Sequence, residues 1–184
     1  MWRLFAAAVV LFCFVAASAG YGQTVDYFTA GQDVGTKAYL YWANLHVDRV
    51  AKYLREGRTN DALEELKYTL DRIPNHPQAL MLLGSFFGNS QLAVNYYQQA
   101  LKLYPQYALT HAQYGVYLVL RNQIDDGIAQ IQAALNMDPK LRQGYVWLAM
   151  AYQKKGNLEL ARSAAERARE LGYQGKIPGE GPER

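Results

Sequence analysis

The sequence has almost none of the cysteine that metal, haem and disulfide chemistry require. Cys13 is the only cysteine among 184 residues, so no disulfide framework, paired-cysteine zinc site or CxxCH haem site can form within one chain. Strong charge is absent too, because the net charge is +3 at pH 7, and this excludes a dedicated nucleic-acid binder. The sequence as a whole, with 51% hydrophobic and 13% aromatic residues, has the composition of a folded protein.

A long apolar run stands at the start of the sequence. Residues 4–16 carry no charge, Arg3 precedes them, and Ala17-Ser18-Ala19 has the small-x-small pattern that a signal peptidase accepts. We therefore predict a signal peptide over residues 1–19, cleaved after Ala19. An uncleaved anchor is the alternative, although a spanning helix needs roughly 20 apolar residues. Cleavage would leave a chain without cysteine, which suits an oxidising compartment. We expect a periplasmic or secreted protein with no stable membrane anchor after cleavage.

A repeat of about 34 residues runs through the rest of the chain. Four similar segments begin with a small residue, and the spacings between them are 31, 34 and 34 residues: Ala62, Ala93, Gly127 and Ala161. In the first three segments a proline follows: Pro74, Pro105 and Pro139. Large–small pairs precede the later segments: Leu83-Gly84, Tyr114-Gly115 and Leu148-Ala149. This period predicts helical hairpins that must stack, because one hairpin cannot bury both of its apolar faces.

The pattern resembles the tetratricopeptide repeat over about residues 43–173. In that family helix A of each unit carries the large–small pair, helix B carries two small residues seven apart, and proline closes the unit. The resemblance implies an all-α fold, a right-handed superhelix of about four helix–turn–helix units. Two departures stand out: unit one has Arg49-Val50 where the pair belongs, and unit two is three residues short between Phe87 and Leu92. The shortening is either a tolerated deletion or a notch that fits a group on a partner.

The expected organisation places a signal peptide at 1–19, an N-terminal arm at 20–36, the array at 37–173 and a flexible tail at 174–184. The units span about 43–76, 77–107, 108–141 and 142–173. Hydrophobic spacing predicts helices near 37–56, 59–73, 77–88, 90–104, 107–121, 124–137, 141–155 and 158–172. Thr59 and Asn157 are the candidate N-caps of the first and last B helices.

The resemblance also implies a concave face lined by the A helices, where partners bind. The corresponding positions are mostly apolar, which a solvated helix face is not. They are Val47, Ala51, Leu54 and Arg55 in unit one; Met81, Ser85 and Gly88 in unit two; Leu109, Ala112, Val116 and Val119 in unit three; and Val146, Met150, Gln153 and Lys154 in unit four.

Something must cover such an apolar face, and two occupants are open. One is an apolar helix or extended segment of a partner protein. The other is the arm of this chain, residues 20–42, where Tyr21, Tyr27, Phe28 and Tyr39 could insert. Both occupants are possible in turn if the arm covers the face in the free protein and a partner displaces it on binding.

Residues for catalysis or metal binding do not converge. His46 and His111 occupy matching sites two units apart, too far for one metal ion, and we predict that both are packed core histidines. The adjacent carboxylates of Glu64-Glu65 and Asp125-Asp126 diverge around a helix. No phosphate loop or GxSxG elbow is present. The sequence therefore predicts no catalytic residue, no metal site and no cofactor.

The sequence as a whole predicts a non-enzymatic adaptor or scaffold. It would be exported, and it would hold a segment of another exported or envelope protein in the concave face during assembly of an envelope complex. The alternative is a permanent structural subunit of a larger periplasmic or extracellular complex. A small-ligand function would need converging polar groups in the groove, and we find none there.

Overall fold

The fold is all-α, as the repeat pattern predicts. The computed structural model describes residues 24–32, 34–88, 91–178 and 180. These residues form eight helices, which are α1 (Val34–Arg55), α2 (Thr59–Arg72), α3 (Pro77–Phe86), α4 (Gln91–Leu103), α5 (Ala108–Leu120), α6 (Ile124–Met137), α7 (Arg142–Lys155) and α8 (Leu158–Glu170). Residues 1–23, which contain the predicted signal peptide, lie outside the described part. None of the helices in the described part of the chain is long and apolar enough to span a bilayer.

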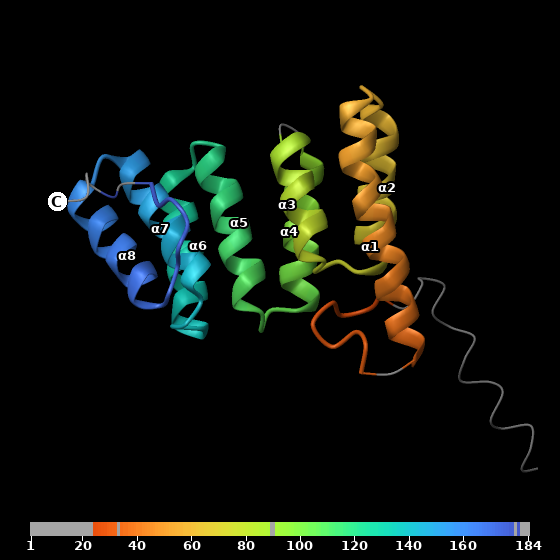
Figure 1. The fold of residues 1–184 in the computed structure, drawn as a ribbon, viewed down its shortest axis with the longest axis horizontal. Coiled ribbons are helices and arrows are strands. Elements are labelled where there is room, and N and C mark those ends of the chain that lie inside the picture. Colours follow the sequence, from red (N-terminus) through yellow and green to blue (C-terminus); the bar gives the residue numbers. More distant parts are fainter. Residues whose placement is uncertain (1–23, 33, 89–90, 179, 181–184) are drawn as a thin grey trace, which may run out of the picture.

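The helices stand side by side as hairpins, from α1 and α2 at one end to α7 and α8 at the other (Figure 1). Hairpins α1–α2, α5–α6 and α7–α8 are closely packed, and α6 also packs well on α7. The middle of the array is looser, because α4 touches both α3 and α5 only sparingly. The shortening of unit two falls on its first helix: α3 has 10 residues, against 13 in α5 and 14 in α7.

Glycines allow the tight packing of the third hairpin. A Cβ atom at Gly115 would lie 2.6 Å from Ile131 Cγ1 and 2.7 Å from the Gly127 carbonyl oxygen. A Cβ atom at Gly127 would lie 2.6 Å from the Gly115 carbonyl oxygen. The backbones of α5 and α6 therefore meet at the two small residues that the repeat pattern supplies.

Two main core clusters result from this packing. Units one and two bury the first around Leu66, Leu80 and Tyr97. Units three and four bury the second around Val119 and Ile131. The Tyr97 hydroxyl donates to the Leu80 carbonyl oxygen over 3.1 Å, and burial raises the pKa of Tyr97. The junction between the clusters runs through α5, because Tyr117 and Leu118 belong to the first cluster and Val116 and Val119 to the second.

Side chains at the helix starts confirm one predicted cap and contradict the other. Asn157 Oδ1 accepts a hydrogen bond from the Leu160 N–H over 3.2 Å, as expected of an N-cap. Thr59 is not a cap, because α2 begins at Thr59 and Arg58 takes the N-cap position without a side-chain bond. A third helix start has an N-cap that was not predicted, because His76 caps α3 and accepts a hydrogen bond from the Ala79 N–H over 3.3 Å.

Part of the C-terminal tail is packed where the sequence predicted flexibility, at Ile177 and Glu180. Ile177 is only 2% exposed and belongs to the same core cluster as Ala165 and Ala168 of α8. Arg169 of α8 donates two hydrogen bonds to the Glu180 carboxylate, over 2.5 and 2.6 Å. The ion pair lowers the pKa of Glu180. The tail thus covers apolar surface that the last hairpin would otherwise expose.

Candidate partner-binding surfaces

The stripe expected to line the concave face divides into a buried and an accessible set. Five members are at most 5% exposed and pack into the core: Val47, Ala112, Val116, Val119 and Val146. Their burial follows from the close approach of neighbouring helices. These five contribute to packing between units, and they offer little surface to a partner.

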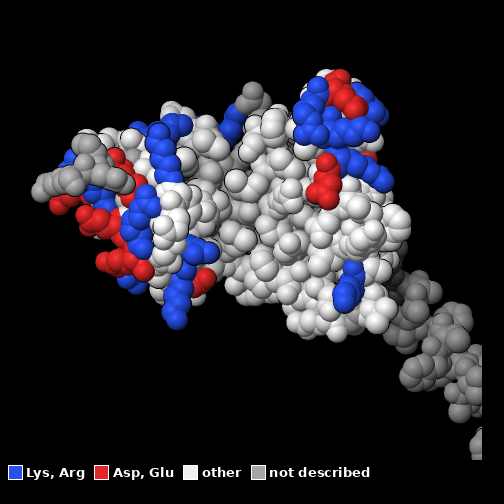
Figure 2. All heavy atoms as spheres, viewed as in Figure 1, with Lys and Arg blue, Asp and Glu red and all other residues white. Residues whose placement is uncertain are grey.

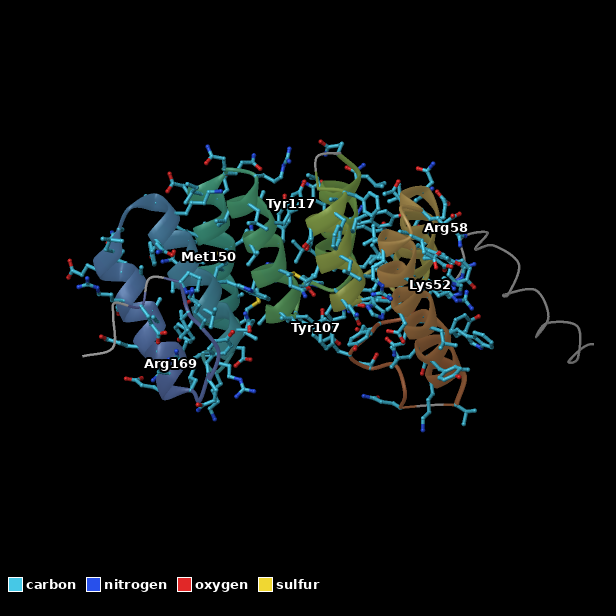
Figure 3. The ribbon with its side chains drawn as sticks, turned by 45° about the horizontal axis from the view of Figure 1, so that its top comes forward. Lys52, Arg58, Tyr107, Tyr117, Met150 and Arg169 are labelled. Atoms are coloured by element: carbon cyan, nitrogen blue, oxygen red, sulfur yellow. The ribbon has the colours of Figure 1, made fainter. Side chains whose placement is uncertain are left out.

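The accessible members are fewer and more polar than the sequence suggested. Exposed or half-buried are Ala51, Leu54, Arg55, Met81, Ser85, Gly88, Leu109, Met150, Gln153 and Lys154. The structure brings the members from α3, α5 and α7 together, because α3 packs on α5 and α5 on α7, whereas α1 joins α3 chiefly through α2. The Lys154 ammonium donates to the Val119 carbonyl oxygen over 2.8 Å, which fixes this cation beside α5. Figure 3 places Met150 on the part of the array formed by units three and four.

The described part of the N-terminal arm, residues 24–32, does not fill this face. The Val25 N–H donates to the Arg72 carbonyl oxygen over 2.7 Å, at the end of α2. The Tyr27 ring packs edge-on against His76, and the Phe28 ring stacks on Tyr107 at 4.2 Å. Residues 24–32 therefore lie along the turns between units. Tyr39 is 54% exposed on α1, and Tyr21 lies outside the described residues.

Asp26 is the polar centre of the arm. Its carboxylate accepts from the Tyr107 hydroxyl over 2.5 Å and from Asn75 Nδ2 over 2.7 Å. The bond to Asp26 raises the pKa of Tyr107. Asn75 Oδ1 in turn accepts from the Tyr27 N–H over 2.9 Å. One acidic side chain thus ties the arm to the turns before α3 and α5.

The three histidines are structural. His46 pairs with Glu65 across the first hairpin, and His111 Nδ1 meets Gln130 Oε1 at 3.2 Å across the third. Both rings are hydrogen-bonded as predicted, but both are only half-buried, so the prediction that they are core histidines is wrong. His76 is 1% exposed and lies 3.0 Å from Asn44 Oδ1 through Nε2. Burial lowers the pKa of His76 to about 4. Among the described residues, no three His, Cys, Asp or Glu side chains gather as a metal site would require.

Sequence reasoning missed a cleft between α4 and α6. The cleft has a volume of about 740 Å³ and α5 forms its floor. Its lining is rich in amides and aromatic rings: Gln91, Gln98, Tyr114, Tyr117, Gln123 and Gln130. Figure 3 shows Tyr117 in the space between α5 and the α3–α4 pair. A signal for this surface was present in the sequence, because residues 73–101 contain no Asp, Glu, Lys or Arg.

A second exposed surface lies on the first half of α1. Tyr41 and Trp42 are 62% and 56% exposed, with their rings in edge-on contact at 5.8 Å. Tyr39 is exposed on the same half of the helix. Large exposed aromatic side chains are common at protein interfaces.

Comparisons with known proteins agree with the repeat architecture. A family model described as tetratricopeptide repeat matches residues 48–108 and 115–175. The structure of MamA from Desulfovibrio magneticus RS-1 is 26% identical, with a TM-score of 0.51 over 71% of this chain and 75% of that one. No curated protein sequence matches the chain.

Two further solved structures show the fold alone. YrrB, described as a TPR protein with an unusual peptide-binding site, is 18% identical, with a TM-score of 0.51 over 76% of this chain and 72% of that one. A mutant O-GlcNAc transferase from Thermobaculum terrenum is 23% identical, with a TM-score of 0.51 over 70% of this chain but only 26% of the enzyme. The shared part of these molecules is the array of helical hairpins.

Proposed function

This chain belongs to the tetratricopeptide repeat family, and from that premise we propose that it is an exported, non-enzymatic scaffold that assembles other proteins. Repeats of this family bind protein or peptide partners, and YrrB is described as having a peptide-binding site. The scaffold would hold a segment of an exported or envelope protein against the accessible side chains of its A helices.

One observation carries the proposal: the described part of the chain's own arm leaves those side chains uncovered. Residues 24–32 dock on the turns between units, through Asp26 and Asn75. Met81, Leu109 and Met150 therefore stay partly accessible on three helices that pack in sequence. Apolar side chains on such a surface are suited to an apolar helix or extended segment.

Export is the second part of the proposal. The apolar run over residues 4–16, followed by Ala17-Ser18-Ala19, supports secretion with cleavage after Ala19. The mature chain would then start at Gly20 and work in the periplasm or outside the cell. Mass spectrometry of the protein purified from its native host tests this directly, and a mature chain that retains residues 1–19 contradicts it.

The binding experiment is affinity capture from the envelope fraction, with mass spectrometry to identify the partner. Met150→Lys should remove the captured partner, because it places a charge on the accessible face of α7. Met137→Lys is the matched control, since Met137 is 48% exposed on α6, outside the proposed face. Equal capture by both variants rejects the concave-face mechanism. If the partner is still captured by Met150→Lys and stays bound at high salt, the result would favour the alternative function, a permanent structural subunit of a larger complex.

A further inference from the structure

We propose that the cleft between α4 and α6 is a second binding site, which takes an uncharged, extended segment of a partner polypeptide through its backbone. The site is independent of the A-helix face proposed above. Its volume of about 740 Å³ lies within the range of about 300–1,000 Å³ that is typical of ligand pockets. The cleft exists because α4, after the shortened unit two, packs only loosely on α5.

Amide side chains line both walls of the cleft. Gln91 and Gln98 stand seven residues apart on α4, and Gln123 and Gln130 stand seven apart on and just before α6. A spacing of seven returns a side chain to the same side of a helix, about 10 Å further along the axis. Each wall therefore presents two amides that face the same gap.

Such amides match the backbone of an extended chain. A glutamine side chain carries both an acceptor oxygen and two donor hydrogens, so it can pair with a peptide C=O and N–H together. Gln98 and Gln123 have no side-chain hydrogen bond within the described part of the chain. The backbone of a helical ligand could not use them, because the backbone groups of a helix are already paired with one another. The occupant is therefore extended.

The charge distribution selects an uncharged segment. Residues 73–101, which include most of α4, contain no charged side chain, and the middle of the face drawn in Figure 2 is nearly free of Lys, Arg, Asp and Glu. Arg121 and Asp126 also line the cleft, and their opposite charges leave it without net charge. Burying a charged ligand group here would bring no compensating partner along the α4 wall.

The floor adds a platform for side chains of the bound segment. The rings of Tyr114 and Tyr117 lie 12° from parallel with centroids 6.2 Å apart. The Tyr117 hydroxyl donates to the Gly88 carbonyl oxygen over 3.0 Å, which fixes its ring at the end of the cleft. A Cβ atom at Gly88 would lie 2.2 Å from the Gly84 carbonyl oxygen, so only glycine allows this turn.

The test is an NMR titration of the full chain with capped decapeptides. The first probe alternates threonine and serine, which gives an uncharged peptide with low helix propensity. The second alternates threonine and glutamate, and the third is an alanine–glutamine helix former. Because the amides bind the backbone, we expect the first probe to shift the side-chain amide signals of Gln98 and Gln123, with a Kd on the order of 1 mM. The charged and helical probes should bind about tenfold more weakly.

Matched variants locate the site. Gln98→Glu places a charge in the cleft and should weaken binding of the first probe about tenfold. Gln99→Glu is the control, because Gln99 is exposed on the same helix but does not line the cleft. Met150→Lys should leave this binding unchanged, which separates this site from the proposed function.

Several results would overturn the proposal. They are the absence of amide shifts at about 5 mM probe, equal binding of the three peptides, and equal effects of the two glutamine variants. Sedimentation provides a further check, since a dimer of the full chain that Gln98→Glu dissociates would show that a second copy occupies the cleft.

Discussion

The Tyr107 hydroxyl and the Asp26 carboxylate, 81 residues apart in the chain, meet at 2.5 Å. The bond connects the arm to the turn between units two and three. Asn75 reaches the same carboxylate from the turn between units one and two. The loosest part of the array is thus spanned by an arm that precedes all of the repeats.

Removing this bond should loosen the arm. Tyr107→Phe should lower the free energy of unfolding by about 1 kcal/mol, because the lost bond has a charged acceptor but is partly open to water. Urea denaturation measures the change, and limited proteolysis within residues 24–32 should become faster. Tyr39→Phe is the control, since Tyr39 is exposed on α1. Equal effects of the two variants would show that the arm does not depend on Asp26.

Acid should destabilise the protein through His76. Its pKa is about 4 in the folded state, against 6.5 for the free side chain. Between these two pH values the unfolded chain therefore binds more protons than the folded chain. The contribution of His76 to the free energy of unfolding is fully present above pH 6.5 and is lost as the pH falls towards 4. The shift corresponds to a loss of about 3 kcal/mol.

Denaturation at a series of pH values measures that loss. His76→Asn retains a side chain that can cap α3 but cannot titrate in this range. The difference between wild type and variant therefore isolates His76 from the other histidines. The same slope in both proteins between pH 4 and 6.5 would contradict the assignment.

Gly115 should not tolerate a methyl group. In Gly115→Ala the new Cβ would meet the Gly127 carbonyl oxygen at 2.7 Å, so the α5 and α6 backbones must separate, at a net loss of about 2 kcal/mol. Gly84→Ala is the comparison, because its nearest neighbours are Tyr117 and Tyr97 side-chain atoms at 3.2 and 3.3 Å, and small ring movements suffice. Thermal unfolding should separate the two variants, and similar melting temperatures would show that the α5–α6 contact is adaptable.

Val116→Asp should strongly destabilise the protein, because Val116 packs in the core and is not accessible to a partner. Val116 is 5% exposed within the core of units three and four. A carboxylate there would lose most of its hydration, so the loss should be about 3 kcal/mol or more. Circular dichroism with urea denaturation measures it. A variant of unchanged stability would show that this position opens to solvent.

The fold could be predicted from the sequence because its determinants are local. Small residues at a fixed period specify close helix approach, and Gly115 and Gly127 meet as that pattern requires. The site could be predicted less well, since a position such as Val119 is apolar whether it faces a partner or a neighbouring helix. Exposure depends on which neighbouring segment covers each apolar position, and the apolar pattern alone does not encode that.

The docking position of the predicted arm and the cleft were missed for a related reason. Asp26 and Tyr107 are brought together only by tertiary structure, so no spacing in the sequence connects them. The cleft depends on how far α4 stands from α6 after a shortened unit. The run of uncharged residues at 73–101 was the one feature of the sequence that indicated an unusual surface on α4.

Ile177 and Glu180 have a consequence for assembly. Solenoid units stack because each leaves an apolar flank for the next, and here the tail occupies the flank beyond α8. Another helical hairpin, or the α1–α2 end of another molecule, could pack there only by displacing the segment that contains Ile177 and Glu180. Stacking of further apolar surface on this side of α8 would therefore require the segment around Ile177 to move away first.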